Sequence, residues 1–211
     1  LQEDIKKTGY VVLASELKHA KKINGYFELT LNSSDKIQCN YLINASGLHT
    51  EDVANRIEEI NLPKIKTVMY AKGHYYFYKK KNPFKHLIYP LPNSNGHGIH
   101  AGMDIENNLR FGPNAKWVDS IEYSFDENTL EEFCNSIKSY WVNFDPSCLS
   151  PDYTGIRSKI VAEGEGSQDF EILDATDHGL KNLIHLQGID SPGLTSSLSI
   201  AAEVISKLGI H

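Results

Sequence analysis

The sequence predicts an α/β fold combined with an α+β fold. Residues 183–208 indicate the α/β part, because an apolar strand ends at Gly188 and an apolar pattern at helical spacing follows it. Residues 41–59 show a second strand that ends at a glycine and leads into a helix. Residues 64–160 indicate the α+β part, because apolar and polar residues alternate there as in antiparallel strands.

These patterns predict two domains. Residues 1–62 and 180–211 form the first, because the last strand and helix have the form of a βα unit that rejoins the first sheet. Residues 63–179 form the second, which is rich in sheet and has Pro63 at its boundary. We interpret the opening helix, glycine and strand as half of a βαβ unit whose first strand is absent.

The other elements follow from local patterns. Thr50 is expected to cap a helix that ends near Glu59. Alternation places six side chains on one face of the strand 65–80, namely Val68, Tyr70, Lys72, His74, Tyr76 and Tyr78. Further helices are expected at 1–8, 128–141 and 194–208, and further strands at 10–14, 16–23, 26–31, 36–40, 86–92, 97–105, 109–113, 151–161 and 170–173.

Composition excludes several classes of function. The 211 residues are 40% hydrophobic and 23% charged, as in ordinary globular proteins, and no apolar run is long enough to span a membrane. The net charge of −6 argues against nucleic acid as a partner. The three cysteines, Cys39, Cys134 and Cys148, lack metal-ligand spacing, so we predict no metal site and a reducing, cytoplasmic location.

The start of the last helix is a candidate binding feature. Pro192 and Gly193 lead into it, so its first backbone N–H groups and partial positive charge are directed at whatever lies in front. Such an end can bind an anion, although no phosphate-loop lysine follows. The alternative is an ordinary N-capped helix. The side chain of Asp190 is expected to point away from a bound anion, where it can cap the helix.

Three motifs carry a resemblance to a known family: YLINASGLHTEDVA, PFKHLIYPLPNSNGHGIHAGMDIENNLRFGPNAKWV, and PDYTGIRSKI with NLIHLQGIDSPGLTSSLSIAAEV. Together they resemble the FAD-dependent oxidoreductases of the D-amino-acid-oxidase superfamily, and most closely the L-2-hydroxyglutarate dehydrogenases and oxidases. The resemblance implies the C-terminal part of that FAD-binding fold, with a mixed or antiparallel substrate domain. The N-terminal ADP-binding βαβ unit is not in this sequence, because Gly164-Glu165-Gly166 lacks the third glycine of its motif. We therefore interpret the chain as a fragment that is inactive alone, with the missing N-terminal part of the same protein as its partner.

The resemblance also implies which residues contact FAD in the full-length protein. The strand end at Asn44-Ala45-Ser46-Gly47 would pass close to the cofactor, where small residues are needed; a plain strand-to-helix turn is the alternative. The glycine turn and helix start would lie against the pyrimidine edge of the flavin. The cofactor-binding residues implied are Ser46, Gly47, Gly188, Ile189, Ser191, Pro192, Gly193, Leu194 and Thr195.

Candidate catalytic and substrate-binding residues are Arg157, His86, His100, His74 and Tyr89. By resemblance, Arg157 binds a substrate carboxylate or borders the flavin, and a salt-bridged arginine at a strand end is the alternative. Oxidation of a secondary alcohol needs a proton acceptor, for which His86 or His100 is suited. His74 and Tyr89 are expected to contact substrate, and Gly102 stands where the family usually has threonine.

The resemblance therefore predicts FAD-dependent oxidation of a 2-hydroxy acid, with L-2-hydroxyglutarate as the favoured small-molecule substrate. Hydride transfer from the 2-carbon to flavin N5 would give 2-oxoglutarate. The electron acceptor is not identified by the sequence, and peripheral association with the inner membrane stays open. An amino-acid or amine oxidase of the same superfamily and a catalytically silent binding fragment are the alternatives.

Overall fold

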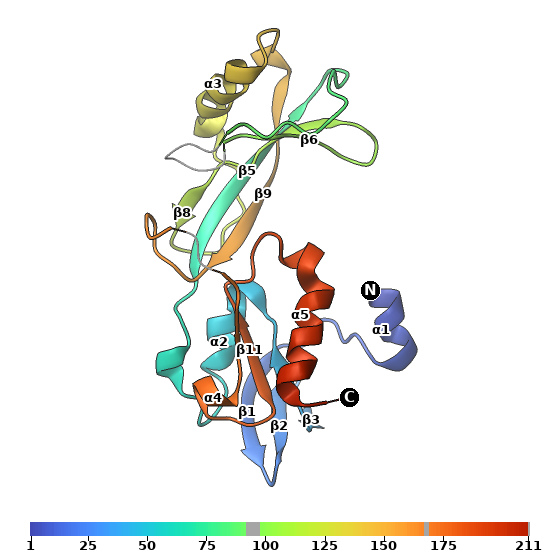
Figure 1. Ribbon diagram of the computed structural model, residues 1–211, viewed down its shortest axis with the longest axis vertical. Coiled ribbons are helices and arrows are strands. Elements are labelled where there is room, and N and C mark those ends of the chain that lie inside the picture. Colours follow the sequence, from blue (N-terminus) through green and yellow to red (C-terminus); the bar gives the residue numbers. More distant parts are fainter. Residues whose placement is uncertain (92–97, 167–168, 211) are drawn as a thin grey trace. The chain divides into compact units, whose positions relative to one another are not determined.

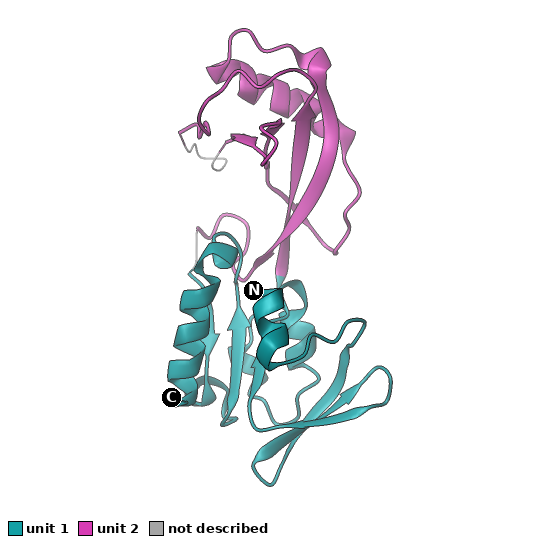
Figure 2. Ribbon diagram, turned by 90° about the vertical axis from the view of Figure 1, so that its right-hand side faces the viewer, with its two compact units in different colours: residues 1–68, 168–211 teal, residues 69–167 magenta. Residues whose placement is uncertain are grey.

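The computed structural model describes residues 1–91, 98–166 and 169–210, and it divides the chain into two compact units (Figures 1 and 2). Unit 1 comprises Leu1–Val68 and Gln168–His211, and unit 2 comprises Met69–Ser167. Contacts within the chain therefore assign residues 63–68 and 168–179 to unit 1, whereas the sequence pattern assigned them to the sheet-rich domain.

Unit 1 begins with a short helix and an antiparallel meander. The helix α1 (Gln2–Thr8) has no buried residue. The strands β1 (Leu17–Ile23), β2 (Tyr26–Leu31) and β3 (Lys36–Cys39) pair in sequence order, as predicted. The strand expected at residues 10–14 is not formed, and Tyr10 is 95% exposed. An isolated apolar segment cannot satisfy its backbone groups as a strand, and it has no pairing partner among the residues described here.

The second sheet of unit 1 has the strand order β10 (Glu171–Leu173), β11 (Leu183–Gln187), β4 (Leu42–Asn44). The strand β11 pairs antiparallel with β10 and parallel with β4, and all five of its residues are buried. A strand that is buried on both faces usually has a nearly continuous run of apolar residues. The strand β11 follows this rule at Leu183, Ile184 and Leu186, whereas its polar residues His185 and Gln187 are buried as well.

Three helices accompany this sheet: α2 (Thr50–Ala54), α4 (Ala175–His178) and α5 (Gly193–Leu208). Val204 of α5 packs with Ile184 and Leu186 of β11. The expected helix to Glu59 is shorter than predicted, and Thr50 does not cap it. The Thr50 hydroxyl instead donates to the Leu186 carbonyl at 2.7 Å, so that it ties α2 to β11.

Unit 2 is built on two long antiparallel strands, β5 (Met69–Tyr78) and β9 (Leu149–Lys159). The other edge of β5 pairs with β8 (Lys116–Val118) near its start and with β7 (Leu109–Phe111) near its end. The strand β6 (Ala101–Met103) pairs with β7. The helix α3 (Leu130–Tyr140) follows. The described residues of the chain also form short 3-10 helices at Gly47–His49, Leu62–Lys64, Glu127–Thr129 and Pro146–Cys148.

One face of the unit 2 sheet forms its core. Tyr76 and Tyr78 of β5, which the alternation placed on one face of the strand, pack there with Phe133 and Ile137 of α3. The strand expected at residues 86–92 is wrong over its described part, since only Ile88 pairs, in an isolated bridge with Ala101. The surrounding residues Leu87, Tyr89 and Leu91 are exposed. The expected strand 97–105 is reduced to β6, and its residue 97 lies outside the described residues.

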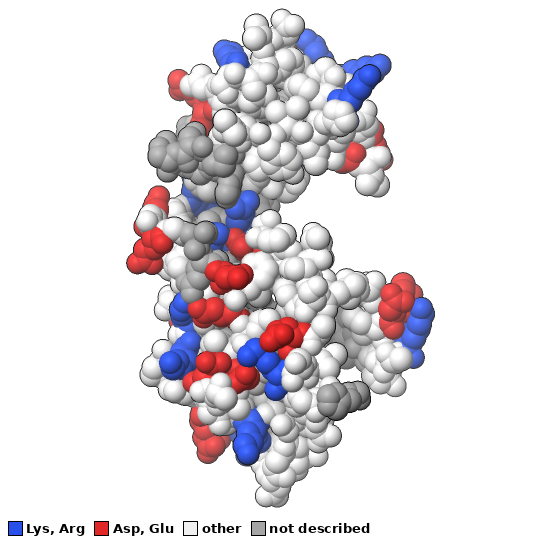
Figure 3. Space-filling view, in the orientation of Figure 1, with Lys and Arg blue, Asp and Glu red and all other residues white. Residues whose placement is uncertain are grey.

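The charges form no broad patch of one sign on the face seen in Figure 3, where basic and acidic side chains are interspersed. Most of the basic residues with a described partner lie beside a carboxylate, for example Arg56 beside Glu16 and Lys116 beside Asp126. Within the described residues, no helix is long and apolar enough to cross a membrane.

Candidate functional site

The face of the unit 2 sheet opposite the α3 core carries the candidate substrate residues. His74 and Tyr76 point into the core, so the alternation of β5 places Tyr75 on the opposite face. The Tyr75 ring stacks on Tyr153 of β9, with the ring centroids 4.5 Å apart and the planes 16° from parallel. The pairing of β5 with β9 shifts register at this point, where the extra residue of a β-bulge brings Tyr153 beside Tyr75.

Arg157 lies on the same face of β9 as Tyr153, two alternations along the strand. Burial is the main cause of the raised pKa of Tyr75, and Tyr153 adds to it, whereas the positive charge of Arg157 opposes it. The positive charge of Arg157 therefore acts on the Tyr75 phenol from the same face of the sheet. Arg157 makes no ion pair with a carboxylate in the part of the chain that is described. The salt-bridged arginine, the alternative reading of the sequence, is not observed there.

Arg110 differs from Arg157, because its guanidinium forms ion pairs with two carboxylates. Its Nε donates to Asp152 Oδ2 at 2.6 Å, and its Nη1 donates to Asp104 Oδ2. Its guanidinium also lies over the Phe77 ring, 5.7 Å from the centroid. The side chain of this β7 residue thus spans the sheet face from the turn after β6 to the bulge of β9.

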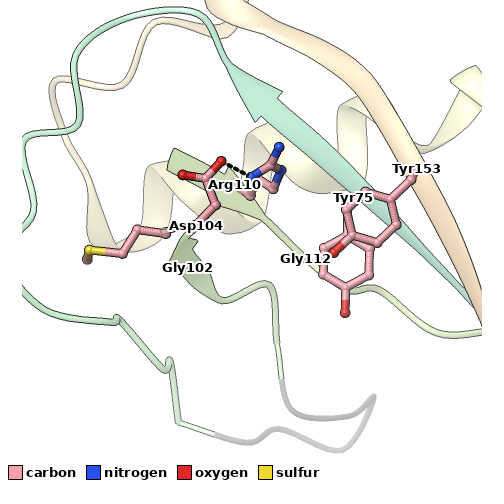
Figure 4. A pocket seen from close by; sticks show the side chains of 7 residues that line it. Tyr75, Gly102, Asp104, Arg110, Gly112 and Tyr153 are labelled. Atoms are coloured by element: carbon pink, nitrogen blue, oxygen red, sulfur yellow. Dashed lines mark hydrogen bonds and ion pairs between the residues drawn. The ribbon is translucent and has the colours of Figure 1, made fainter. Parts of the chain in front are cut away.

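A hollow of about 240 Å³ lies between the Arg110–Asp104 ion pair and the stacked rings of Tyr75 and Tyr153 (Figure 4). Gly102 and Gly112 contribute no side chain to it, and Tyr75 and Tyr153 stand together on one side. Gly112 is required for this packing, because a Cβ there would lie 2.6 Å from the His74 carbonyl oxygen and 2.8 Å from the Tyr75 ring. A Cβ on Gly102 would meet nothing closer than 3.9 Å, so the space beside it is open.

His100 lies next to this hollow. Its carbonyl accepts a hydrogen bond from the Gly112 amide at 3.0 Å, and alternation places its side chain on the same face as Gly102. The Tyr89 ring packs against the imidazole, with 4.2 Å between centroids. His86 is exposed in the segment before the Ile88 bridge. Of the two histidines expected to act as base, His100 is therefore the one that the structure brings to the Tyr75 face.

His74 lies on the other face of the sheet, and this corrects the expectation that it contacts substrate. Its side chain is 1% exposed, its Nδ1 lies 3.0 Å from Asn114 Oδ1, and its ring meets Phe125 edge-on. Burial lowers its pKa, so the imidazole is neutral at neutral pH. Its position in the α3 core gives it a structural role.

The candidate cofactor residues lie in unit 1 at one edge of its mixed sheet. Since β4 and β11 are parallel and Asn44 pairs with His185, the residues that follow each strand leave the sheet at the same edge. After β4 the Ser46 hydroxyl donates to Asn44 Oδ1 at 2.6 Å, and Gly47 has a φ of +59°. After β11 Gly188 has a φ of +69°, and the turn leads into α5. Ligands in open α/β sheets bind at such carboxyl edges.

The N-cap residue of α5, Pro192, makes no side-chain cap hydrogen bond, and the first turn of this fully described helix holds no acidic residue. The carbonyl oxygen of Asp190 accepts a hydrogen bond from the Gly193 amide, so the backbone of this residue lies at the start of the helix. Ile189 packs against Gly193, where a Cβ would lie 2.6 Å from Ile189 Cγ2. Ser191, Pro192, Leu194 and Thr195 are exposed at this end.

Sequence reasoning missed Tyr75, Tyr153 and Arg110. The alternation along β5 places Tyr75 on the face opposite to His74 and Tyr76, and this was the signal in the sequence that could have identified it. Tyr153 and Arg110 could not be grouped with it, because the bulge in β9 and the register of β7 determine which residues meet across the sheet.

The chain is similar in fold to proteins of known structure. Its structure is similar to that of L-alpha-glycerophosphate oxidase from Mycoplasma pneumoniae, with a TM-score of 0.77 and 16% identity over 93% of this chain and 50% of that chain. It is also similar to glycine oxidase from Geobacillus kaustophilus, with a TM-score of 0.71 and 13% identity over 94% of this chain and 50% of that one. These likenesses show that the chain shares the fold of both enzymes.

Sequence comparison gives the family. The family model described as FAD dependent oxidoreductase matches residues 1–207, and the chain belongs to this family, which confirms the assignment made from the motifs.

Relatives include mitochondrial L-2-hydroxyglutarate dehydrogenase of Arabidopsis thaliana, 32% identical over 80% of this chain, and glycerol 3-phosphate dehydrogenase of Caloramator mitchellensis, 28% identical over 89%. The L-2-hydroxyglutarate dehydrogenase of Indibacter alkaliphilus is 25% identical over 82%. The chain spans 37%, 37% and 51% of the lengths of these three relatives, respectively.

Proposed function

We propose that the protein containing this chain uses FAD to oxidise a 2-hydroxy acid, with L-2-hydroxyglutarate as the first candidate substrate and 2-oxoglutarate as the product. The observation that carries this proposal is the guanidinium of Arg157, which has no carboxylate partner among the described residues and lies on the same face of the unit 2 sheet as Tyr75. A planar guanidinium suits a substrate carboxylate, which it can bind through two parallel hydrogen bonds.

The residues of unit 1 fit the cofactor of the family. The uncapped first turn of α5 offers backbone N–H groups and a partial positive charge, and the exposed Leu194 and Thr195 leave it accessible. Gly47 and Gly188 allow the chain to turn sharply at the edge where β4 and β11 end. We assign Ser46, Gly47 and residues 188–195 to the contacts with FAD. When bound, FAD supplies the acceptor for the hydride that leaves the substrate.

On the substrate side, each residue has one task. Arg157 binds the 1-carboxylate, and the Tyr75 hydroxyl is available to donate to the same carboxylate. His100 takes the proton of the 2-hydroxyl group, because a neutral imidazole is a suitable base near neutral pH. Tyr89 packs against His100 and holds the imidazole in place. His86 is the second choice for the base, since it belongs to the same motif but lies exposed.

A second candidate is an amino-acid or amine oxidase, for which the same Arg157 and Tyr75 would bind the carboxylate and no histidine base would be needed. The names of relatives also include glycerol 3-phosphate dehydrogenase. The electron acceptor stays open between a quinone, oxygen and another compound. The third alternative, a binding fragment without catalytic activity, remains for the chain taken alone.

The test is anaerobic titration of the full-length flavoprotein with L-2-hydroxyglutarate, glycerol 3-phosphate and a panel of amino acids. We expect bleaching of the flavin absorbance band by L-2-hydroxyglutarate and not by the others. Bleaching by amino acids alone would establish the second candidate. No bleaching by any 2-hydroxy acid would refute the proposal.

A further inference from the structure

The hollow beside Gly102 lies next to the proposed reaction site and has no role in it so far. The stacked rings of Tyr75 and Tyr153 line one side of the hollow, and Gly102 leaves space on another side because it has no side chain. These glycine and aromatic surfaces suit the methylene groups of a substrate side chain. The hollow continues the line that runs along the sheet face from Arg157 past Tyr75.

We propose that this hollow receives the side chain of the 2-hydroxy acid, beyond the carbon that is oxidised, and that it prefers an uncharged side chain to a second carboxylate. The inference rests on the proposed function and narrows its substrate class. L-2-hydroxyglutarate remains a substrate, but it reacts as one member of a broader class.

The preference follows from the charges at the far end of the hollow. Arg110 contributes one positive charge, whereas Asp104 and Asp152 contribute two negative charges, and both carboxylates touch the guanidinium. Hydrogen bonds from the side chain and backbone of Asn108, together with Arg110, lower the pKa of Asp104 to about 2, so this carboxylate stays ionised. A second substrate carboxylate that approaches Arg110 therefore also approaches two like charges, and the attraction is cancelled.

The difference between Arg157 and Arg110 supports a binding role for Arg157 and a preference for an uncharged group near Arg110. Both arginines lie on the same face of one sheet, but only Arg110 has its charge neutralised by described carboxylates. The 1-carboxylate thus has in Arg157 a guanidinium that no described carboxylate neutralises. The substrate side chain instead meets Arg110, whose Nε and Nη1 already donate to Asp152 and Asp104 and whose guanidinium lies over the Phe77 ring.

The test compares L-2-hydroxyglutarate with its 5-amide, which has nearly the same shape without the second charge, on the full-length holoenzyme. We expect kcat/KM for the amide to exceed that for the acid by about tenfold, the effect of one uncompensated charge at this range. Asp152→Asn removes one negative charge and should bring the two substrates to about equal kcat/KM. Asp152 is the better choice for this variant, because Asp104 also accepts the amides of Glu106 and Asn108 in its turn.

Two further variants locate the effect. Gly102→Thr fills the hollow and should lower kcat/KM for the amide by about tenfold, while the nearest contact of its Cβ, at 3.9 Å, lets the strand fold. Asp35→Asn removes an exposed negative charge in the turn between β2 and β3 and should leave the ratio of the two substrates unchanged.

Two results would overturn the inference while leaving the proposed function intact: a wild-type preference for the acid, or an amide activity that Gly102→Thr does not reduce. A flavin that neither compound reduces would overturn the proposed function, and the inference with it.

Discussion

Asn44 and His185 meet across the parallel pair β4–β11, with 3.0 Å between Asn44 Nδ2 and His185 Nδ1. The amide of Asn44 also donates to the Thr50 carbonyl at 2.8 Å, so it holds the start of α2 as well. The imidazole must accept this hydrogen bond at Nδ1, which requires its neutral form. The strand end at Ser46-Gly47, where we place the cofactor, therefore depends on a buried neutral histidine.

This arrangement makes the stability of unit 1 dependent on pH. Burial lowers the pKa of His185 from 6.5 to about 4. The unfolded chain therefore binds the proton first as the pH falls, so the contribution of His185 to the free energy of unfolding should be constant above about pH 7 and decrease between about pH 6.5 and pH 4. The expected loss from this residue is about 3 kcal/mol.

Urea unfolding of the chain at about pH 7.5 and about pH 4.5 measures this loss, with His185→Gln as the comparison because glutamine cannot titrate. His185→Gln should be less stable than the wild type at the higher pH and should lose less stability on acidification. Equal pH dependence of the two proteins would show that His185 does not carry the effect.

Gly102 and Gly112 provide a matched pair for the packing of the sheet face. Gly112→Ala should destabilise unit 2 by about 2 kcal/mol or more, because Gly112 has a φ of +138° and its new Cβ would collide with the His74 carbonyl and the Tyr75 ring. Gly102→Ala should change stability by less than about 0.5 kcal/mol. Thermal unfolding of the two variants checks this, and a Gly112→Ala protein as stable as the wild type would contradict the packing described.

The first turn of α5 can be tested with a charge. Thr195→Glu places a carboxylate near the partial positive charge of this helix end, so it should stabilise the chain without cofactor by about 0.5 kcal/mol. The same charge should weaken FAD binding to the full-length protein by about tenfold, if this helix end faces the cofactor. Ser199→Glu, one turn along the exposed face, is the control. FAD affinity that is the same in both variants would remove α5 from the cofactor site.

The two candidate bases differ in their surroundings, and this separates them experimentally. His100→Gln should lower kcat for a 2-hydroxy acid by about a hundredfold and abolish the acidic limb of the pH profile of kcat. His86→Gln should leave that limb in place. The pH profiles of both variants decide the assignment, and the reverse pattern would identify His86 as the base.

The sequence predicted most of the elements, because their signals are local. The helix at 128–141 and the strands β1 to β3 follow from spacing and turn residues that lie close together in the chain. The prediction of a strand at residues 86–92 was wrong over its described part. It rested on the apolar residues of this segment, but Leu87, Tyr89 and Leu91 are exposed in the structure. The prediction of a strand at residues 10–14 was wrong because a strand must pair with a second strand, and the local sequence pattern does not show whether such a partner exists.

The candidate site was predicted only in part for the same reason. Arg157 and His100 belong to motifs and could be proposed from the sequence. His74 was grouped with Tyr76 and Tyr78 on one face of a strand, and only the packing of α3 shows that this face is the core. The meeting of Tyr75 with Tyr153, and of Arg110 with Asp152, depends on strand register and a bulge between distant segments.

The central claim is that Arg157 binds the carboxylate of a 2-hydroxy acid, and rapid mixing of the anaerobic full-length protein with L-2-hydroxyglutarate tests it most directly. The substrate dissociation constant, from the concentration dependence of flavin reduction, should rise by about 10- to 100-fold in Arg157→Gln, the effect of a lost hydrogen bond to a charged group. Arg56→Gln, which breaks the ion pair with Glu16, should not change it. An Arg157→Gln protein that binds L-2-hydroxyglutarate as tightly as the wild type would contradict the claim.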